Sequence, residues 1–285
     1  MKVFRWPKMN ENRHLVSHRK YMRDNIELKG KLSIVTGGSR GIGRGISESL
    51  AELGSDLAVV YRKNKDEFEN LKSSLEPYGM RIEGYRLDVT DFNKVCETFK
   101  EIYDHFGTIN ILVNCAGRAS STLSVEKVTL KEWHAVIDLD LNAAFYCSKA
   151  VLGYMHKNRG GHIINISSVV ASTCHAGSSS YAAGKAALEA LTKVLAREEA
   201  RYGIRVNAIA PGLIKSDMSA QMSKVYGEER MKEIFESIPL GKFGDPRDVG
   251  NMVAYLVSSK GNYITGQILG IDGGMYYWKS TLMDL

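Results

Sequence analysis

The chain has 285 residues, of which 44% are hydrophobic and 25% charged, and it contains 27 Gly but only 5 Pro, which excludes a disordered or collagen-like protein. No run approaches the roughly 18 apolar residues of a membrane span, and the amino terminus has no apolar run that would serve as a secretory signal. We therefore expect a cytoplasmic protein with no membrane contact. The formal net charge is +6, but +4 of it belongs to residues 1–28, so the body lacks the basic face that nucleic acid requires.

The first 28 residues form a basic extension with seven Lys or Arg and three Asp or Glu. Within residues 12–23, Leu15, Val16, Tyr21 and Met22 give one apolar side to a short predicted helix. Two interpretations stay open: this helix packs on a neighbouring subunit, or the extension has no function.

The four cysteines, Cys96, Cys115, Cys147 and Cys174, lie far apart among small or apolar neighbours and include no C-x-x-C pair. This spacing favours buried, reduced thiols over disulfides or a zinc site, and we expect no metal.

From residue 29 to residue 274, short runs rich in Val and Ile alternate with segments of helical periodicity, which predicts a single doubly wound α/β domain with a seven-stranded parallel sheet. The segment 213–240 interrupts this alternation and is predicted to be a helical lid over a site, and residues 275–285 form a tail. The expected strands are 32–35, 57–61, 82–87, 109–113, 162–166, 205–209 and 267–271, and the expected helices are 42–53, 65–78, 92–106, 130–158, 181–202 and 246–258.

A glycine-rich turn follows the first strand directly and leads into a helix. Only glycine lets backbone pass close to a pyrophosphate and direct free N–H groups of a helix start at it, so dinucleotide binding is favoured over a merely tight turn. The candidate residues of this turn are Gly37, Ser39, Arg40, Gly41, Ile42 and Gly43.

The end of the second strand indicates which dinucleotide binds. An NAD-binding chain places a carboxylate there for the ribose 2′-hydroxyl, whereas this chain has Tyr61, Arg62 and Lys63. Arg62, with Arg40 in the glycine turn, can instead pair with a 2′-phosphate, so NADP(H) is predicted over NAD. The alternative is that both are ordinary surface arginines.

Tyr181 and Lys185 stand four residues apart at the start of a predicted helix and therefore project from one face. A neighbouring ammonium stabilises a phenolate, which makes tyrosine usable as an acid or base. Ser168 follows the fifth strand at the carboxyl edge of the sheet, where a hydroxyl can hydrogen-bond a carbonyl oxygen that gains charge.

These motifs, together with Asn-Cys-Ala-Gly at 114–117, Pro211-Gly212 and Ile-Asp-Gly-Gly at 271–274, resemble the short-chain dehydrogenase/reductase family over residues 28–274. The resemblance implies a Rossmann-type sheet of order 3-2-1-4-5-6-7, a homotetramer, and hydride transfer between a nicotinamide cofactor and a carbonyl or alcohol substrate. Tyr181 would be the general acid, Lys185 would lower its pKa, and Ser168 would orient the substrate. The further cofactor contacts implied are Asp88 and Val89 toward the adenine, Asn114, Ala116 and Gly117 in the middle, and Pro211, Gly212 and Ile214 over the nicotinamide.

One position departs from the family pattern. Where the family carries Asn, 28 residues before the serine, this chain has Asp140, and Asn142 comes two positions later. An Asp carboxylate could hold the water that links Lys185 to solvent, and its charge would keep Lys185 protonated. We therefore include Asp140 among the catalytic residues. The alternatives are that Asn142 takes the role after a shift of the helix, or that neither residue matters.

The overall likeness is to 3-oxoacyl-[acyl-carrier-protein] reductases, which dock an acidic carrier through two basic residues flanking the site. Here one such position is Arg159, and the other is Tyr202 with Arg201 beside it, so a carrier partner is plausible and surface arginines are the alternative. Substrate contacts are expected from residues 118–123, from residues 173–179 including His175, and from residues 215–240. The aromatic residues 276–278 are expected either to form a subunit contact or to close a neighbouring subunit's pocket.

Three functions remain open on the sequence. The first is an NADPH-dependent reductase of a 3-oxoacyl thioester or similar β-keto substrate. The second is a carbonyl, sugar or polyol dehydrogenase with the same catalytic groups, favoured by Asp140. The third is a dinucleotide-binding regulator without turnover, against which the intact Ser168, Tyr181 and Lys185 argue.

Overall fold

A seven-stranded parallel sheet forms the centre of the computed structural model, which describes residues 27–216, 232–234 and 236–275. The strand order is β3-β2-β1-β4-β5-β6-β7, and every neighbouring pair is parallel. The predicted doubly wound α/β fold is confirmed. The strands are β1 (Leu32–Thr36), β2 (Asp56–Tyr61), β3 (Ile82–Arg86), β4 (Ile111–Asn114), β5 (Gly161–Ile166), β6 (Ile204–Pro211) and β7 (Ile268–Ile271).

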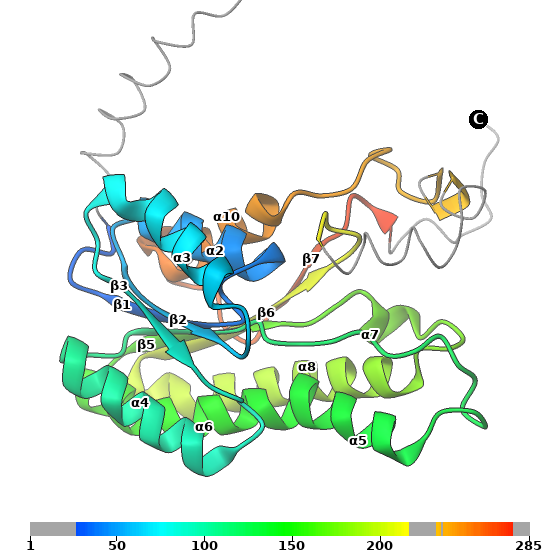
Figure 1. Cartoon of the computed structure of the whole chain (residues 1–285), viewed down its shortest axis with the longest axis horizontal. Helices are drawn as coiled ribbons and strands as arrows, with labels where there is room; N and C mark the ends of the chain where they lie inside the picture. The colour runs from blue at the N-terminus through cyan, green and yellow to red at the C-terminus, as the bar shows by residue number, and fades with distance from the viewer. Residues whose placement is uncertain (1–26, 217–231, 235, 276–285) are drawn as a thin grey trace, which may run out of the picture.

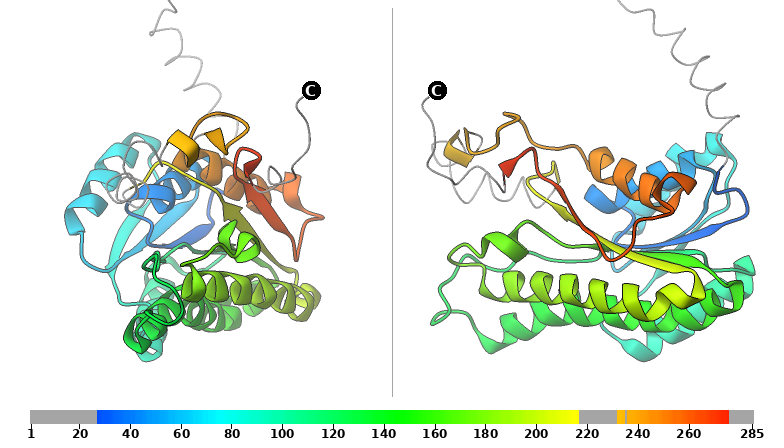
Figure 2. Two further views of the ribbon diagram at one scale, coloured as in Figure 1. Left: turned by 90° about the vertical axis from the view of Figure 1, so that its right-hand side faces the viewer. Right: turned by 180° about the vertical axis from the view of Figure 1, so that it is seen from behind.

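Helices cover both faces of the sheet, so the molecule has three layers (Figure 1). One face carries α2 (Gly41–Glu52), α3 (Lys65–Leu75) and α10 (Pro246–Val257). The other carries α4 (Phe92–Phe106), α5 (Leu130–Ile137), α6 (Ala143–Asn158) and α8 (Ser179–Glu199), which run below the sheet in both views of Figure 2. The short α7 (Val170–Thr173) lies between β5 and α8. None of the helices formed by the described residues combines the length and apolarity that a membrane crossing requires.

The central strands are mostly apolar because each of their two faces packs on a helical layer. In β1, Ile34 belongs to the core against α4 and α6, whereas its neighbour Val35 belongs to the core against α2 and α10. Both side chains are fully buried. This burial on both faces fixes the sheet rigidly, and the loops at its carboxyl edge are held by that frame.

Helices α2 and α10 approach each other closely through glycine. A Cβ added at Gly250 would lie 2.3 Å from the carbonyl oxygen of Gly45, and one added at Gly45 would lie 2.5 Å from the backbone of Pro246. No larger side chain fits between backbones at this separation. The contact holds the amino-terminal turn of α2, and with it the glycine-rich turn, against the body of the sheet.

The helix predicted over residues 130–158 is interrupted, which corrects the sequence prediction. A π-helical turn, η2 (Asp138–Asn142), separates α5 from α6. The extra residue per turn rotates the following side chains, and Asp140 becomes buried among its neighbours. The helices predicted to end at Tyr78 and Tyr202 are α-helical only to Leu75 and Glu199 and finish as the 3₁₀ turns η1 (Glu76–Tyr78) and η3 (Ala200–Tyr202).

The prediction for the cysteines is partly wrong. All four thiols are free, but Cys96 and Cys174 are exposed, Cys115 is half-buried, and Cys147 alone among them is fully buried. Small and apolar sequence neighbours therefore did not predict burial correctly for Cys96 on α4 or for Cys174 after α7. The predicted helix in residues 12–23, most of the predicted lid, and the tail after Met275 lie outside the described residues.

Candidate active site

The candidate residues from distant parts of the chain meet at the carboxyl edge of the sheet. Because the strands are parallel, the turns that follow β1, β4, β5 and β6 all emerge at this edge. They carry the glycine turn, residues 114–117, Ser168, and residues 211–214, respectively. Helix α8 begins at the same edge and brings Tyr181 and Lys185 to it.

Tyr181, Lys185 and Ser168 form one cluster, as their spacing predicted. The Lys185 ammonium lies 5.6 Å from the centre of the Tyr181 ring and donates a 2.9 Å hydrogen bond to the carbonyl oxygen of Ile166, the last residue of β5. The Ser168 hydroxyl is near enough to the Tyr181 phenol to lower its pKa, and it accepts a 3.2 Å hydrogen bond from the amide of Val170. The amino-terminal end of α8 is thereby tied to the end of β5.

Asp140, and not Asn142, lies in this cluster. Its Oδ1 lies 2.8 Å from Lys185 Nζ, and its Oδ2 accepts a bond from the amide of Arg118 at 3.3 Å. The Asn142 side chain instead bonds with Asp138 at 2.8 Å. Both members of the ion pair are almost completely buried, with 1% of Asp140 and 5% of Lys185 exposed. A Cβ at Gly117 would lie 2.7 Å from Asp140 Oδ1, so glycine is needed there for close contact.

Burial and charge act in opposite directions on these groups. Burial raises the pKa of Tyr181 above its usual value, and Asp140 adds to the rise, while Lys185 and the Ser168 hydrogen bond lower it by less. Burial alone would lower the pKa of Lys185, but the adjacent Asp140 and Tyr181 raise it overall. Lys185 therefore stays an ammonium. The expected lowering of the Tyr181 pKa by Lys185 is present, but in this structure burial outweighs it.

The glycine turn has the geometry of a phosphate cradle. Helix α2 begins at Gly41, and the side chain of its N-cap residue Arg40 makes no capping hydrogen bond, so the first N–H groups of the helix face the edge of the sheet. Gly37 and Gly41 have φ of +67° and +51°, a conformation that L side chains rarely adopt. A Cβ at Gly37 would meet the Cα of Ala116 at 3.1 Å, and one at Gly43 would overlap the Gly37 carbonyl at 2.1 Å. Ser39 is buried in this turn and Ile42 half-buried.

Two groups of hydrogen bonds that the sequence analysis missed hold residues 114–117 in place. The hydroxyl of Thr36, at the end of β1, accepts bonds from the amides of Cys115 and Ala116 at 3.0 and 3.1 Å. The Asn114 amide donates to Asn165 at 2.8 Å, and Asn165 donates in turn to Thr192 of α8 at 2.8 Å. A polar residue within the apolar run of β5, where Asn165 lies between two isoleucines, was the available signal for this network.

The basic residues predicted to hold a 2′-phosphate lie after β2 as expected. Arg62 is more than half exposed, and its Nη1 lies 3.9 Å from a carboxylate oxygen of Asp88, at the end of β3. Asp88 also accepts bonds from the amide and hydroxyl of Thr90. Tyr61 stacks on Phe68 with ring centroids 5.6 Å apart. Around them, Arg40 and Lys63 are exposed and Val89 is buried.

The remaining predicted residues lie at the end of β6 and in the loops after β4, β5 and β6, at the same edge of the sheet. Pro211 ends β6, and a Cβ at Gly212 would lie 2.8 Å from the Cα of Asp272 after β7. Ile214 is buried and bridges to Gly244. Two of the predicted substrate loops meet, because a Cβ at Gly177 would lie 2.9 Å from the carbonyl of Thr122. His175 is exposed in the second of these loops.

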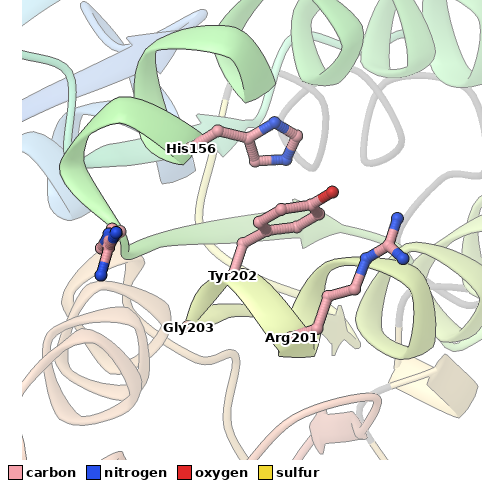
Figure 3. Close-up of a pocket in the computed structure, with 5 residues that line it drawn as sticks. His156, Arg201, Tyr202 and Gly203 are labelled. Atoms are coloured by element: carbon pink, nitrogen blue, oxygen red, sulfur yellow. The ribbon is translucent and has the colours of Figure 1, made fainter.

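The two arginines predicted to dock a carrier protein line one pocket but do not flank this chain's own Tyr181. His156, Arg159, Arg201, Tyr202 and Gly203 surround a surface pocket of about 490 Å³ (Figure 3). The ring centroids of Tyr202 and His156 are 4.0 Å apart, and the guanidinium carbon of Arg201 lies 4.8 Å from the centroid of the Tyr202 ring. Because Arg159 precedes β5 and Arg201 precedes β6, the pocket is at the amino edge of the sheet. Tyr181 is near the opposite end of the 21-residue α8, about 30 Å along its axis.

The fold and site together define a Rossmann-type oxidoreductase that acts on a carbonyl or its alcohol. A family model described as enoyl-(acyl carrier protein) reductase matches residues 37–276. The chain belongs to the short-chain dehydrogenase/reductase family.

Proteins similar to this chain are 3-oxoacyl-[acyl-carrier-protein] reductases and a dehydrogenase of known structure. It is 40% identical to the reductase of Staphylococcus epidermidis, over 86% of this chain and 99% of that one. The identity to the reductase of Aquifex aeolicus is 38%, over 88% and 99% of the two chains. A putative short-chain alcohol dehydrogenase from Sinorhizobium meliloti superposes with a TM-score of 0.84 at 32% identity, over 89% and 99% of the chains. These matches confirm the family to which the sequence motifs pointed.

Proposed function

We propose that this protein is an NADPH-dependent reductase that converts the ketone of a 3-oxoacyl thioester to a secondary alcohol. The cluster of the half-buried Tyr181 with the buried Lys185 and Ser168 at the carboxyl edge of the sheet carries this proposal. The 3-oxoacyl-[acyl-carrier-protein] reductases at about 40% identity support the substrate class.

In this mechanism the chain handles the proton and the orientation of the substrate, and bound NADPH supplies the hydride. Ser168 donates a hydrogen bond to the carbonyl oxygen and fixes its distance from the Tyr181 phenol. Tyr181, kept protonated by its buried position, donates its proton to that oxygen. Lys185 stabilises the resulting phenolate, and Asp140 holds Lys185 in its charged form.

The cofactor site fits NADP(H) by its charge and by its backbone geometry. The uncapped start of α2 and the glycines at 37, 41 and 43 would take the pyrophosphate. Arg40 and Arg62 would take the 2′-phosphate, with Tyr61, Lys63, Asp88 and Val89 around the adenosine. Lys185 and Tyr181 would hold the nicotinamide ribose between Asn114, Ala116 and Gly117 on one side and Pro211, Gly212 and Ile214 on the other.

The second candidate function is reduction of a free ketone, sugar or polyol by the same groups. The observation that favours it is the Asp140–Lys185 ion pair, because the family pattern has Asn at the Asp140 position. The two functions share the cofactor and the proton donor, so they differ in the substrate that the segments expected to contact it, residues 118–123, 173–179 and 215–240, admit.

We also propose that the chain forms a homo-oligomer, a tetramer as in its family, and that an acidic carrier protein docks at the Arg159/Arg201 pocket. Helix α8 exposes a row of small side chains along one side, namely Ala183, Ala186, Ala190 and Val194. Because these side chains are small, a second helix can pack closely against this face. If two such helices pair antiparallel, the arginine pocket of one copy comes near Tyr181 of the other. The Arg159→Glu/Arg201→Glu variant should then raise KM for a carrier-bound substrate and leave KM for a short free thioester unchanged.

The test of the substrate is the initial rate of NADPH oxidation with a 3-oxoacyl thioester compared with diketones, ketoses and simple ketones. Preferential reduction of the thioester supports the first function, and preference for a free ketone or ketose supports the second. NADPH binding without turnover on any of them would support the regulator instead.

The test of the proton donor is Tyr181→Phe, which removes one hydroxyl from the buried cluster. We expect turnover to fall by about 10³-fold or more while the Kd for NADPH stays within about twofold of the wild type. Turnover that survives this substitution would contradict the assignment.

A further inference from the structure

A third polar side chain of α8 continues the row that Tyr181 and Lys185 begin. Glu189 stands four residues after Lys185, so all three lie along one side of the helix. Each of them contacts the segment that ends β5: Tyr181 contacts Ser168, Lys185 contacts the Ile166 carbonyl, and Glu189 contacts Ser167. The first two contacts belong to the cluster described above, and the third has no part in it.

The contact between Glu189 and Ser167 is short and part-buried, because Ser167 is buried while Glu189 is partly exposed. The Ser167 hydroxyl donates a 2.8 Å hydrogen bond to Glu189 Oε1 and lies 3.4 Å from the Lys185 carbonyl oxygen. Ser167 is 3% exposed, so its hydroxyl depends on these two acceptors. The Glu189 carboxylate is a stronger acceptor than the Lys185 carbonyl, because its hydrogen bond is charge-assisted. No described residue forms an ion pair with Glu189.

Ser167 is covalently joined to Ser168, and both are fixed from several directions. The Ser167 amide donates a 2.7 Å bond to the carbonyl of Ile209 in β6, which holds its backbone. The Cα atoms of successive residues are about 3.8 Å apart, so a shift of Ser167 moves Ser168 with it. The Ser168 hydroxyl must remain within hydrogen-bond distance of both Tyr181 and the substrate oxygen, and small errors in such positions lower rates strongly.

We propose that Glu189 is a positioning residue, which sets the place of Ser168 by holding Ser167 against α8. It touches neither substrate nor cofactor. This inference rests on the proposed carbonyl reduction for its kinetic consequence, but the effect on the Ser167–Ser168 segment is independent of the reaction.

The kinetic test compares Glu189→Leu, Glu189→Gln and Ser167→Ala with the control Glu198→Leu, an exposed glutamate of the same helix. In Glu189→Leu we expect kcat to fall by about tenfold or more, with the Kd for NADPH unchanged. Glu189→Gln should recover most of kcat, because its amide oxygen accepts the same bond. Glu198→Leu should match the wild type.

The double variant Glu189→Leu/Ser167→Ala separates positioning from a general loss of stability. If the two residues act as one unit, the double variant is no slower than the slower single variant. The proposal would be overturned if the rate losses of the two single variants multiply in the double variant. It would also be overturned if Glu189→Leu is as active as Glu198→Leu. If Glu189→Leu does not fold, Ser167→Ala and Glu189→Gln test the same bond with smaller changes.

Hydrogen exchange gives a readout that needs no turnover. The amides of Ser167 and Val170 donate to Ile209 and to the Ser168 hydroxyl, so they report on this segment. We expect them to exchange about tenfold faster in Glu189→Leu and at the wild-type rate in Glu198→Leu. Unchanged exchange in Glu189→Leu would overturn the positioning role. A wild-type enzyme that reduces no carbonyl would refute the proposed function alone, because this exchange result stands without it.

Discussion

Asp140 stands where the sequence analysis expected the asparagine of the family, and its carboxylate makes the buried ion pair with Lys185. The carboxylate raises the pKa of Tyr181 and of Lys185. In the proposed mechanism Tyr181 must carry its proton in order to reduce a carbonyl, so reduction should decline as the pH rises through its pKa. Replacement by the isosteric asparagine removes the negative charge, which lowers both pKa values.

For Asp140→Asn we therefore expect the alkaline limb of the kcat/KM profile for reduction to move to lower pH. The measurement is the rate of NADPH oxidation between neutral and strongly alkaline pH for both enzymes. A limb that stays in place or moves upward would show that Asp140 does not act on Tyr181 through its charge.

Replacement of the Arg62 side chain tests whether the protein prefers NADPH over NADH. A charge-assisted bond to a 2′-phosphate contributes roughly 1.5–3 kcal/mol, so Arg62→Ala should weaken NADPH binding by about tenfold or more. NADH lacks that phosphate, and its affinity should not change. The exposed Arg197 of α8, replaced by Ala, is the matched control. Equal weakening of both cofactors, or none, would contradict the role given to Arg62.

Between elements, the contact of α2 with α10 depends on two glycines that have no room for a side chain. A Cβ at Gly250 would lie 2.3 Å from the Gly45 carbonyl, so Gly250→Ala should destabilise the fold by about 1–3 kcal/mol. On α6, a Cβ at Gly153 would have nothing within 4 Å, and Gly153→Ala should stabilise the fold by about 0.5–1 kcal/mol. Thermal unfolding of the two variants should show Tm changes of opposite sign.

Elements whose signals are local in the sequence were predicted well, and elements defined by packing were not. The strands and most helices follow from runs and periodicities a few residues long, and the spacing from Tyr181 to Lys185 follows from helix geometry alone. The π-helical turn at Asp138–Asn142 was not predicted, because it contains no Gly or Pro that would interrupt the helical pattern. Contacts such as Thr36 with Ala116 and Glu189 with Ser167 join positions 18 or more residues apart, so no local pattern shows them.

At the scale of the whole molecule, the direction of the parallel strands decides which motifs meet. Residues after a strand gather at the carboxyl edge, which is why the sequence order correctly placed the glycine turn beside Ser168. Arg159 and Arg201 each precede a strand, and the same rule places them at the opposite edge. The sequence analysis placed them beside the site because it followed the family likeness and not the strand direction.

The stability of the whole fold should depend on pH through His162, which lies on β5 between β4 and β6. Burial, with Arg205 and Lys31 nearby, lowers the pKa of His162 to about 3 in the folded protein. Its Nδ1 is buried and has no hydrogen-bond partner among the described residues. In the unfolded chain the ring has an ordinary pKa of about 6.5, so below that pH the unfolded state binds a proton that the folded state does not.

The free energy of unfolding should therefore fall as the pH drops from about 6.5 toward 3, by up to about 1.4 kcal/mol per pH unit for this group. His162→Phe, which keeps a ring and cannot titrate, should lose about 2–3 kcal/mol less than the wild type between pH 7 and pH 4.5. Denaturant unfolding at both pH values measures the difference. At pH 8 both rings are neutral, so the difference in unfolding free energy between the two proteins reports packing alone. This difference is subtracted from the differences measured at lower pH. Parallel pH dependence in the two proteins would show that His162 is protonated or exposed in the folded state.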